Sequence, residues 1–354
     1  MNLVRYPVRK NETLKAWDSS DELLLAHMAS LDLAQKRILI LNDHFGALSL
    51  GLEGKDCTVY TDSFVSAMGI NLNSQGRIKA INSLAALQGV YDYVMIQIPK
   101  NMSFFEDQLA CLTHHLASHS QLLCASMVKH LSPSSFDLLN KYIGATTTSL
   151  AQKKARLVFA RFEKSPVASP YPRQVKLDGF AKPFLHHSNL FSREKLDIGT
   201  RFFLEHIPRG PFERILDLGC ANGIIGIRAR ELNPHASLVF SDDSAIAIES
   251  ARSNFRTMHG EEAQFLWTNC FEGQPAKTLD LVLCNPPFHQ GTTIGDFIAW
   301  QMFQDAHHAL KPGGWLRVIG NSHLGYQLKL KKIFGASKIV ATNTKFIICE
   351  AQKV

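Results

Sequence analysis

RILDLGCANGIIG, residues 214–226, carries the local pattern that decides the fold. Its first five residues are mainly apolar and predict a buried strand. Gly219 and Gly223 then predict a tight turn, and the apolar residues around and after the second glycine predict the start of a helix. A strand that passes through a glycine turn into a helix is the repeating unit of parallel sheets.

Similar apolar runs continue downstream of this unit. They lie at residues 237–241, 279–284, 315–319 and 345–349. Helical stretches such as 244–258 separate them. The alternation predicts an α/β fold with a parallel sheet covered by helices on both faces.

The first half of the chain repeats this pattern. Its apolar runs lie at residues 37–41, 57–61, 93–98, 121–124 and 156–160. Four matches occur in the same order in both halves: they pair Gly46 with Gly223, Asp62 with Asp242, Gln97 with Asn285 (and Lys100 with Phe288), and Gly144 with Gly335. Any two sheets of this kind share strand spacing, but four ordered matches favour a duplicated domain. We therefore predict two α/β domains, residues 1–163 and 177–354, joined by a proline-rich linker at 164–176.

Bulk composition indicates a folded chain with a basic surface. The sequence has 354 residues, 45% hydrophobic and 19% charged, with a net charge of +7 that favours polyanionic partners. It shows neither a signal peptide nor a membrane-spanning run, so a cytoplasmic protein without a membrane partner is expected. The seven cysteines are scattered, and the His-His pairs lack metal spacing, so neither disulfides nor a metal site are expected. Nothing in the sequence fixes an oligomeric state.

The glycine loop predicts a cofactor site formed by Asp217, Gly219, Cys220 and Gly223. A dinucleotide site would have a glycine where this chain has Ala221, and a carboxylate beside the loop repels phosphate but suits a cationic amino-acid group. Asp242, at the end of the next strand, is placed to bind ribose hydroxyls. Together these features favour S-adenosylmethionine over a nicotinamide cofactor.

Asn269, after the third strand, is a candidate contact for the adenine of the cofactor. An ordinary surface asparagine explains this residue equally well.

A second motif, Asn285, Pro286, Pro287 and Phe288, follows the strand at 279–284. Proline has no N–H group, so the turn offers acceptors: the Asn285 side-chain oxygen and the Pro286 carbonyl. Two acceptors can hold the exocyclic amino group of a nucleobase in line with a methyl donor, and an aromatic ring can stack on a base drawn out of its helix. An ordinary proline turn is the competing interpretation.

On these residues, the second half resembles class I methyltransferases that modify exocyclic amino groups. Over nearly the whole chain, the segments LNDHFGALS, LFSREKLDIGTRFFLEHIP, LDLGCANGIIG, CNPPFHQ and ATNTKF resemble the RsmC/RlmG family of ribosomal RNA guanine-N2 methyltransferases, with the match closer to the branch that acts on 23S rRNA. The resemblance implies two tandem class I methyltransferase-like (Rossmann-type) domains. The N-terminal one would be degenerate and would dock RNA, and the C-terminal one would bind S-adenosylmethionine and hold the guanine at Asn285, Pro286 and Phe288. It also places Phe191 and Ser192 beside the substrate pocket.

Several alternatives remain open at this stage. The same turn could serve a 16S rRNA guanine methyltransferase, a DNA adenine methyltransferase or a protein glutamine methyltransferase, and two inert domains could form a non-catalytic RNA-binding protein. The 23S rRNA substrate could be protein-free or partly assembled. Basic clusters at matching places in the two halves are candidate phosphate contacts or plain solvated surface: Lys153, Lys154, Lys329, Lys331 and Lys332.

Overall fold

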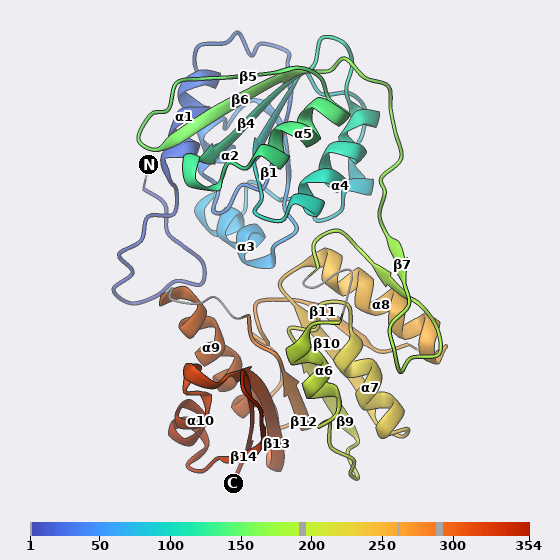
Figure 1. Ribbon diagram of the computed structural model, residues 1–354. Coiled ribbons are helices and arrows are strands. Elements are labelled where there is room, and N and C mark those ends of the chain that lie inside the picture. Colours follow the sequence, from blue (N-terminus) through green and yellow to red (C-terminus); the bar gives the residue numbers. More distant parts are fainter. Residues whose placement is uncertain (1, 191–195, 261, 288–292) are drawn as a thin grey trace. The chain divides into compact units, whose positions relative to one another are not determined.

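The computed structural model describes residues 2–190, 196–260, 262–287 and 293–354 (Figure 1). The chain divides into two compact units, Met1–Pro172 and Arg173–Val354. Each unit is an α/β domain with its own sheet and is described by itself below.

The N-terminal unit is built on a six-stranded sheet in the order β2-β1-β3-β4-β6-β5. The strands are β1 (Arg37–Leu41), β2 (Asp56–Tyr60), β3 (Tyr93–Gln97), β4 (Gln121–Met127), β5 (Thr146–Thr148) and β6 (Ala155–Arg161). The helices are α1 (Ser19–Met28), α2 (Ala47–Gly51), α3 (Phe64–Asn73), α4 (Met102–Leu112) and α5 (Pro133–Tyr142). Residues of α1, α2 and α3 share one core with the inner strands, so these helices cover one face of the sheet.

The C-terminal unit has a seven-stranded sheet in the order β11-β10-β9-β12-β13-β15-β14. The strands are β9 (Arg214–Leu218), β10 (Ser237–Asp242), β11 (Gln264–Trp267), β12 (Leu279–Cys284), β13 (Leu310–Asn321), β14 (Lys338–Thr342) and β15 (Phe346–Gln352). A small hairpin of β7 (Arg173–Val175) and β8 (Phe184–His186) precedes the sheet.

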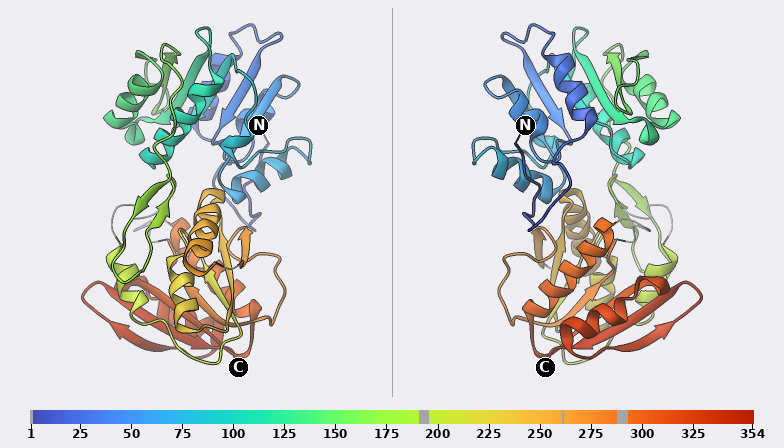
Figure 2. Two further views of the ribbon diagram at one scale, coloured as in Figure 1. Left: turned by 90° about the vertical axis from the view of Figure 1, so that its right-hand side faces the viewer. Right: turned by 90° about the vertical axis from the view of Figure 1, so that its left-hand side faces the viewer.

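Helices cover both faces of this second sheet, as the two views of Figure 2 show from opposite sides. They are α6 (Ile198–Leu204), α7 (Ile224–Leu232), α8 (Ala245–His259), α9 (Thr293–Ala309) and α10 (Tyr326–Phe334). One buried core contains residues of α6, α7 and α8, and a second contains residues of α9 and α10. Strands buried on both faces explain why their sequences are continuous apolar runs.

The two sheets share one topology. Parallel strands run in the order β2-β1-β3-β4 in the N-terminal sheet and β10-β9-β12-β13 in the C-terminal sheet, and each sheet ends in an antiparallel hairpin, β6-β5 or β15-β14. The predicted parallel pairing therefore does not extend to this end, where β15 is antiparallel to both β13 and β14. β14 and β15 are separated by only three residues, and so short a connection can join antiparallel strands alone. Among residues 2–172 no strand corresponds to β11.

The division between the units falls inside segment 164–176, which the sequence analysis treats as a linker. Much of this segment is attached to one unit or the other. The Val167 amide donates to Thr113 Oγ1 (3.0 Å) and the Tyr171 hydroxyl donates to Glu106 Oε2 (3.0 Å), both in the N-terminal unit. Residues 173–175 form β7 in the C-terminal unit. The prolines predicted a segment without helical or strand periodicity. They did not predict that its side chains and backbone would be held by contacts to the two units.

Candidate active site

Three of the predicted motifs meet at one edge of the C-terminal sheet. β9 lies between β10 and β12, with Leu218 in register with both Ser241 and Cys284. All three strands are parallel, so the residues that follow them emerge side by side at the carboxyl edge. These residues are Gly219, Asp242 and Asn285. The structure therefore brings together the glycine loop, the acidic strand end and the Asn-Pro-Pro turn.

Backbone hydrogen bonds tie the glycine loop to Asp242. The amides of Gly219 and Cys220 donate to the Ser241 carbonyl (2.9 and 3.0 Å), and the Ala221 amide donates to Asp242 Oδ2 (2.9 Å). The Ser244 amide, at the start of α8, donates to Asp242 Oδ1 (2.9 Å). A carboxylate has about four acceptor positions. This orientation is thus compatible with further bonds from ribose hydroxyls.

The two glycines of the loop have different reasons to be glycine. Gly219 has φ +75°, and a Cβ there would meet only the flexible Met302 Cε at 3.1 Å. Gly223 has φ +80°, and its Cβ would lie 3.0 Å from the Cβ of Ala251 in α8. Gly219 therefore suits glycine mainly through its positive φ, whereas Gly223 also allows α7 to pack against α8. Ala221, where a dinucleotide-binding loop would have glycine, also has a positive φ of 48°, a conformation that suits glycine better.

Asp217 is fully buried in β9, the strand that leads into the glycine loop. Its Oδ2 accepts from the Gly226 amide in the first turn of α7 (2.8 Å), while Oδ1 has no hydrogen-bond partner among the described residues. Burial, reinforced by the nearby Asp242 charge, raises the pKa of Asp217 to about 8. An unsatisfied buried carboxyl oxygen has a strong tendency to take up a proton or a cationic donor.

Asn285 lies directly after β12. Its Nδ2 donates to Thr200 Oγ1 (3.3 Å), while its Oδ1 is buried without a partner among the described residues. Pro286 is buried beside it and Pro287 is exposed. Phe288, the predicted stacking residue, and the predicted pocket residues Phe191 and Ser192 lie outside the described residues.

Asn269 and Cys220 are both buried near the loop. The Asn269 amide group lies two residues beyond β11 and donates to Glu272 Oε2 (3.0 Å), so Asn269 is not an ordinary surface residue. Burial raises the pKa of the Cys220 thiol well above its ordinary value, so this thiol stays protonated and unreactive at neutral pH.

Sequence reasoning missed a buried asparagine that joins two segments at this edge. Asn254, on α8, accepts from the Leu185 amide (2.7 Å) and donates to the carbonyls of Leu185 (3.1 Å) and Asn222 (3.0 Å). It thereby attaches β8 to the glycine loop, and His186 adds a contact to the Asn222 side chain (3.0 Å). The available signal was that Asn254 lies on the same face of the helix as the buried apolar residues at positions 247, 248, 251 and 255.

The predicted basic contacts lie on exposed elements. Lys331 and Lys332 are exposed on α10, and Lys329 lies 5.4 Å from the Tyr326 ring. Lys153 and Lys154 are exposed in the turn before β6, where Lys153 also pairs with Glu22 (2.8 Å).

In the N-terminal unit the corresponding positions are filled by the chain itself. Gln97, which matches Asn285, donates to Asp21 Oδ1 (2.6 Å) and accepts from the Ser20 hydroxyl (3.0 Å). Asn42, which matches Gly219, has φ +65° and donates from its side chain to the Gln97 carbonyl (2.9 Å). The side-chain oxygen that matches Asn285 Oδ1 is therefore already used within the N-terminal unit.

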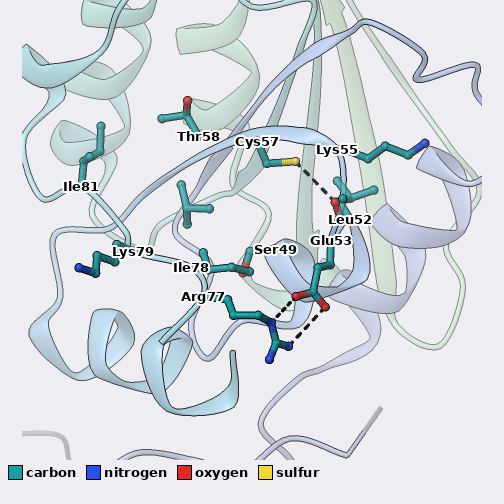
Figure 3. Close-up of a pocket in the computed structure, with 12 residues that line it drawn as sticks. Ser49, Leu52, Glu53, Lys55, Cys57, Thr58, Arg77, Ile78, Lys79 and Ile81 are labelled. Carbon is teal, nitrogen blue, oxygen red and sulfur yellow. Dashed lines mark hydrogen bonds and ion pairs between the residues drawn. The ribbon is translucent and has the colours of Figure 1, made fainter. Parts of the chain in front are cut away.

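Figure 3 shows a pocket of about 440 Å³ in the same unit, away from these positions. It lies along the outer edge of β2, on the side where β11 flanks β10 in the other unit. Arg77 on its rim is bound by Glu53, with Nε and Oε1 2.6 Å apart. The pocket includes none of the predicted site residues.

Within the described ranges, no helix is long and apolar enough to cross a membrane. No group of three or more His, Cys, Asp or Glu side chains in this part of the chain could hold a metal ion.

Comparisons with known proteins find a family model that matches each half of the chain. Residues 1–164 match the RLMG N-terminal domain, and residues 181–350 match the methyltransferase small domain. A Thermus thermophilus 16S rRNA N2 G1207 methyltransferase (RsmC), solved with AdoMet and guanosine, has the same fold, with a TM-score of 0.80 at 21% identity over 95% of this chain and 92% of that one. The fold and the matched domains define an S-adenosylmethionine-dependent methyltransferase.

Relatives with higher sequence identity show to which family of methyltransferases the chain belongs. The ribosomal RNA large subunit methyltransferase G of Pseudomonas fluorescens (strain Pf0-1) is 44% identical over 100% of this chain and 97% of its own length. The enzyme of the same name from Pseudomonas putida (strain GB-1) is 43% identical over the same shares. The chain belongs to the ribosomal RNA large subunit methyltransferase G family.

Proposed function

We propose that this enzyme transfers a methyl group from S-adenosylmethionine to the exocyclic N2 amino group of a specific guanine in 23S rRNA. The names of its relatives support the large-subunit substrate, and the guanosine in the RsmC structure supports the base. The observation that carries the chemistry is the buried Asn285 Oδ1, an acceptor without a partner among the described residues. A cytoplasmic location accompanies the proposal, because ribosomal RNA is the substrate.

The residues at the carboxyl edge fit the cofactor. Gly219 forms the start of the loop at φ +75°, Asp242 would accept from the ribose hydroxyls, and Asp217 Oδ1 is a buried oxygen without a partner among the described residues. Asn269 is our candidate for the adenine contact and Cys220 lines the loop. When bound, the cofactor supplies an electrophilic methyl group on a sulfonium.

The protein would then act mainly by positioning the substrate amine. Asn285 Oδ1 and the Pro286 carbonyl would each accept one N–H bond of the guanine amino group. This arrangement would direct the nitrogen lone pair toward the methyl group. As the N–C bond forms, the bond between the methyl carbon and sulfur breaks, which leaves a neutral thioether, and the nitrogen gives one proton to water. Preorganised acceptors of this kind need no strong general base. Phe288 would stack on the base, and Phe191 and Ser192 would line its pocket.

The N-terminal domain, with its own positions filled, would dock RNA. The overall positive charge of the chain favours such contacts, and the exposed lysines are candidates for phosphate binding: Lys153, Lys154, Lys329, Lys331 and Lys332.

The test is transfer of labelled methyl from S-adenosylmethionine to protein-free 23S rRNA, partly assembled large subunits, 16S rRNA and duplex DNA. Label at a guanine N2 of 23S rRNA, lost in Asn285→Ala, is the expected result. Gln97→Ala changes the matching position of the N-terminal unit and should keep the activity. Label on 16S rRNA or DNA alone would overturn the substrate assignment. Absence of label on every substrate would favour an inert RNA-binding protein.

A further inference from the structure

Asn285 can perform its proposed role only if its amide oxygen, and not its NH2 group, faces the substrate. An asparagine side chain can rotate by half a turn with little change in shape, which exchanges an acceptor for two donors. A donor in that position would repel the N–H groups of the guanine amine. Some neighbouring group must therefore select one of the two orientations.

The residue that contacts the Asn285 amide is Thr200, in the first turn of α6. Thr200 Oγ1 lies 3.3 Å from Asn285 Nδ2, and the two residues are 85 positions apart in the sequence. Thr200 itself is buried, with 7% of its surface exposed. A threonine hydroxyl can donate or accept, so this contact alone does not fix the amide.

Asp197 removes this ambiguity. It is the N-cap of α6, and its Oδ2 accepts from the Thr200 amide (3.0 Å) and lies 3.4 Å from the Thr200 hydroxyl. An ionised carboxylate can only accept, so the hydroxyl proton of Thr200 points to Asp197. The lone pairs of Oγ1 are then left for Asn285, which must present its NH2 group to Thr200.

Gly199 makes room for this arrangement. A Cβ at this position would lie 3.0 Å from Asp197 Oδ2 and 2.8 Å from the Phe346 ring. The carboxylate could not then turn back toward Thr200 without a shift of its neighbours.

We infer that Thr200 and Asp197 form a hydrogen-bond relay that holds the Asn285 amide oxygen toward the substrate amine. Thr200 is a positioning residue for methyl transfer, because it acts through Asn285. This inference rests on the proposed function, because it concerns how Asn285 is presented to the guanine.

The experiment compares the wild type with Thr200→Val, Thr200→Ser and Asn285→Ala. Valine keeps the shape of threonine but cannot accept a hydrogen bond, so the productive orientation would leave a buried NH2 group without a partner. Single-turnover methyl transfer to 23S rRNA should fall about tenfold or more in Thr200→Val, by the cost of such an unpaired donor. Thr200→Ser keeps the hydroxyl and should stay within about threefold of the wild type. The dissociation constant for S-adenosylmethionine should be unchanged in both.

Each outcome bears on a different claim. Wild-type transfer by Thr200→Val, or equal loss in Thr200→Ser, would overturn the relay while leaving the role of Asn285 intact. Full activity of Asn285→Ala would instead show that the proposed function of the turn is wrong. If Thr200→Val does not fold, wild-type activity of Thr200→Ala with normal thermal unfolding would overturn the relay, and loss of transfer with unchanged cofactor affinity would support it.

Discussion

Asp217→Asn is expected to change how the stability of the C-terminal unit depends on pH. In the folded protein, burial raises the pKa of Asp217 to about 8, whereas an aspartate in the unfolded chain titrates near 4. Between these values the folded state holds a proton that the unfolded state has released. The contribution of Asp217 to stability is thus present at low pH and is lost as the pH rises through this window.

The size of the effect follows from one proton. Each pH unit lowers the free energy of unfolding by about 1.4 kcal/mol, so about 3 kcal/mol is lost between roughly pH 5.5 and 7.5. Asparagine has no proton to lose, and its oxygen can still accept from the Gly226 amide. The advantage of Asp217→Asn over the wild type should therefore grow by about 3 kcal/mol across this range.

Urea unfolding at several pH values, followed by tryptophan fluorescence, measures this difference. Three of the four tryptophans, Trp267, Trp300 and Trp315, lie in the C-terminal unit and report its unfolding. Asp305, whose pKa burial raises to about 6, also titrates in this range, but it is present in both proteins and cancels. A difference in stability that stays constant with pH would refute the assignment of a proton to buried Asp217.

Three further results are expected. Gly223→Ala adds a Cβ 3.0 Å from the Ala251 Cβ at φ +80° and should lower the free energy of unfolding by about 3 kcal/mol. The control Gly260→Ala, at φ +68° with open space around it, should lower it by about 1 kcal/mol. Equal urea midpoints for the two variants would contradict this. Asn254→Leu leaves the Leu185 amide and the Asn222 carbonyl unpaired and should lower the free energy of unfolding by at least about 3 kcal/mol. It should also weaken S-adenosylmethionine binding measured by calorimetry. A thermal unfolding midpoint like that of the wild type would argue against this prediction. If both Lys331 and Lys332 contact phosphate, their double alanine variant should lower the slope of log K for RNA against log salt by about 1.5, and an unchanged slope would mark them as solvated surface.

The elements that the sequence predicted well are those that local pattern determines. The runs at 214–218 and 279–284 coincide with β9 and β12, because a strand buried on both faces needs a continuous apolar run wherever it lies in the fold. The short strands β5 and β14 were not predicted, since their three and five residues are polar or at least partly exposed and so form no buried apolar run.

Part of the candidate site could also be predicted from local sequence pattern, and part could not. The order of Gly219, Asp242 and Asn285 after successive strands was enough to place them on one edge, because parallel strands end at the same edge of a sheet. Sequence treated Gly223 as part of the ligand loop, and only the packing of α7 on α8 shows that its Cα faces Ala251.

The sequence by itself thus determined the two α/β domains, the glycine loop and the acceptor turn, because each depends on residues near one another in the chain. The tertiary structure alone decided that Asp217 Oδ1 has no partner among the described residues, that Asn254 attaches β8 to the loop, and that Thr200 contacts Asn285 from 85 positions away. Burial and hydrogen-bond direction depend on which distant side chains the fold brings within about 3 Å, and local periodicity contains no information about them.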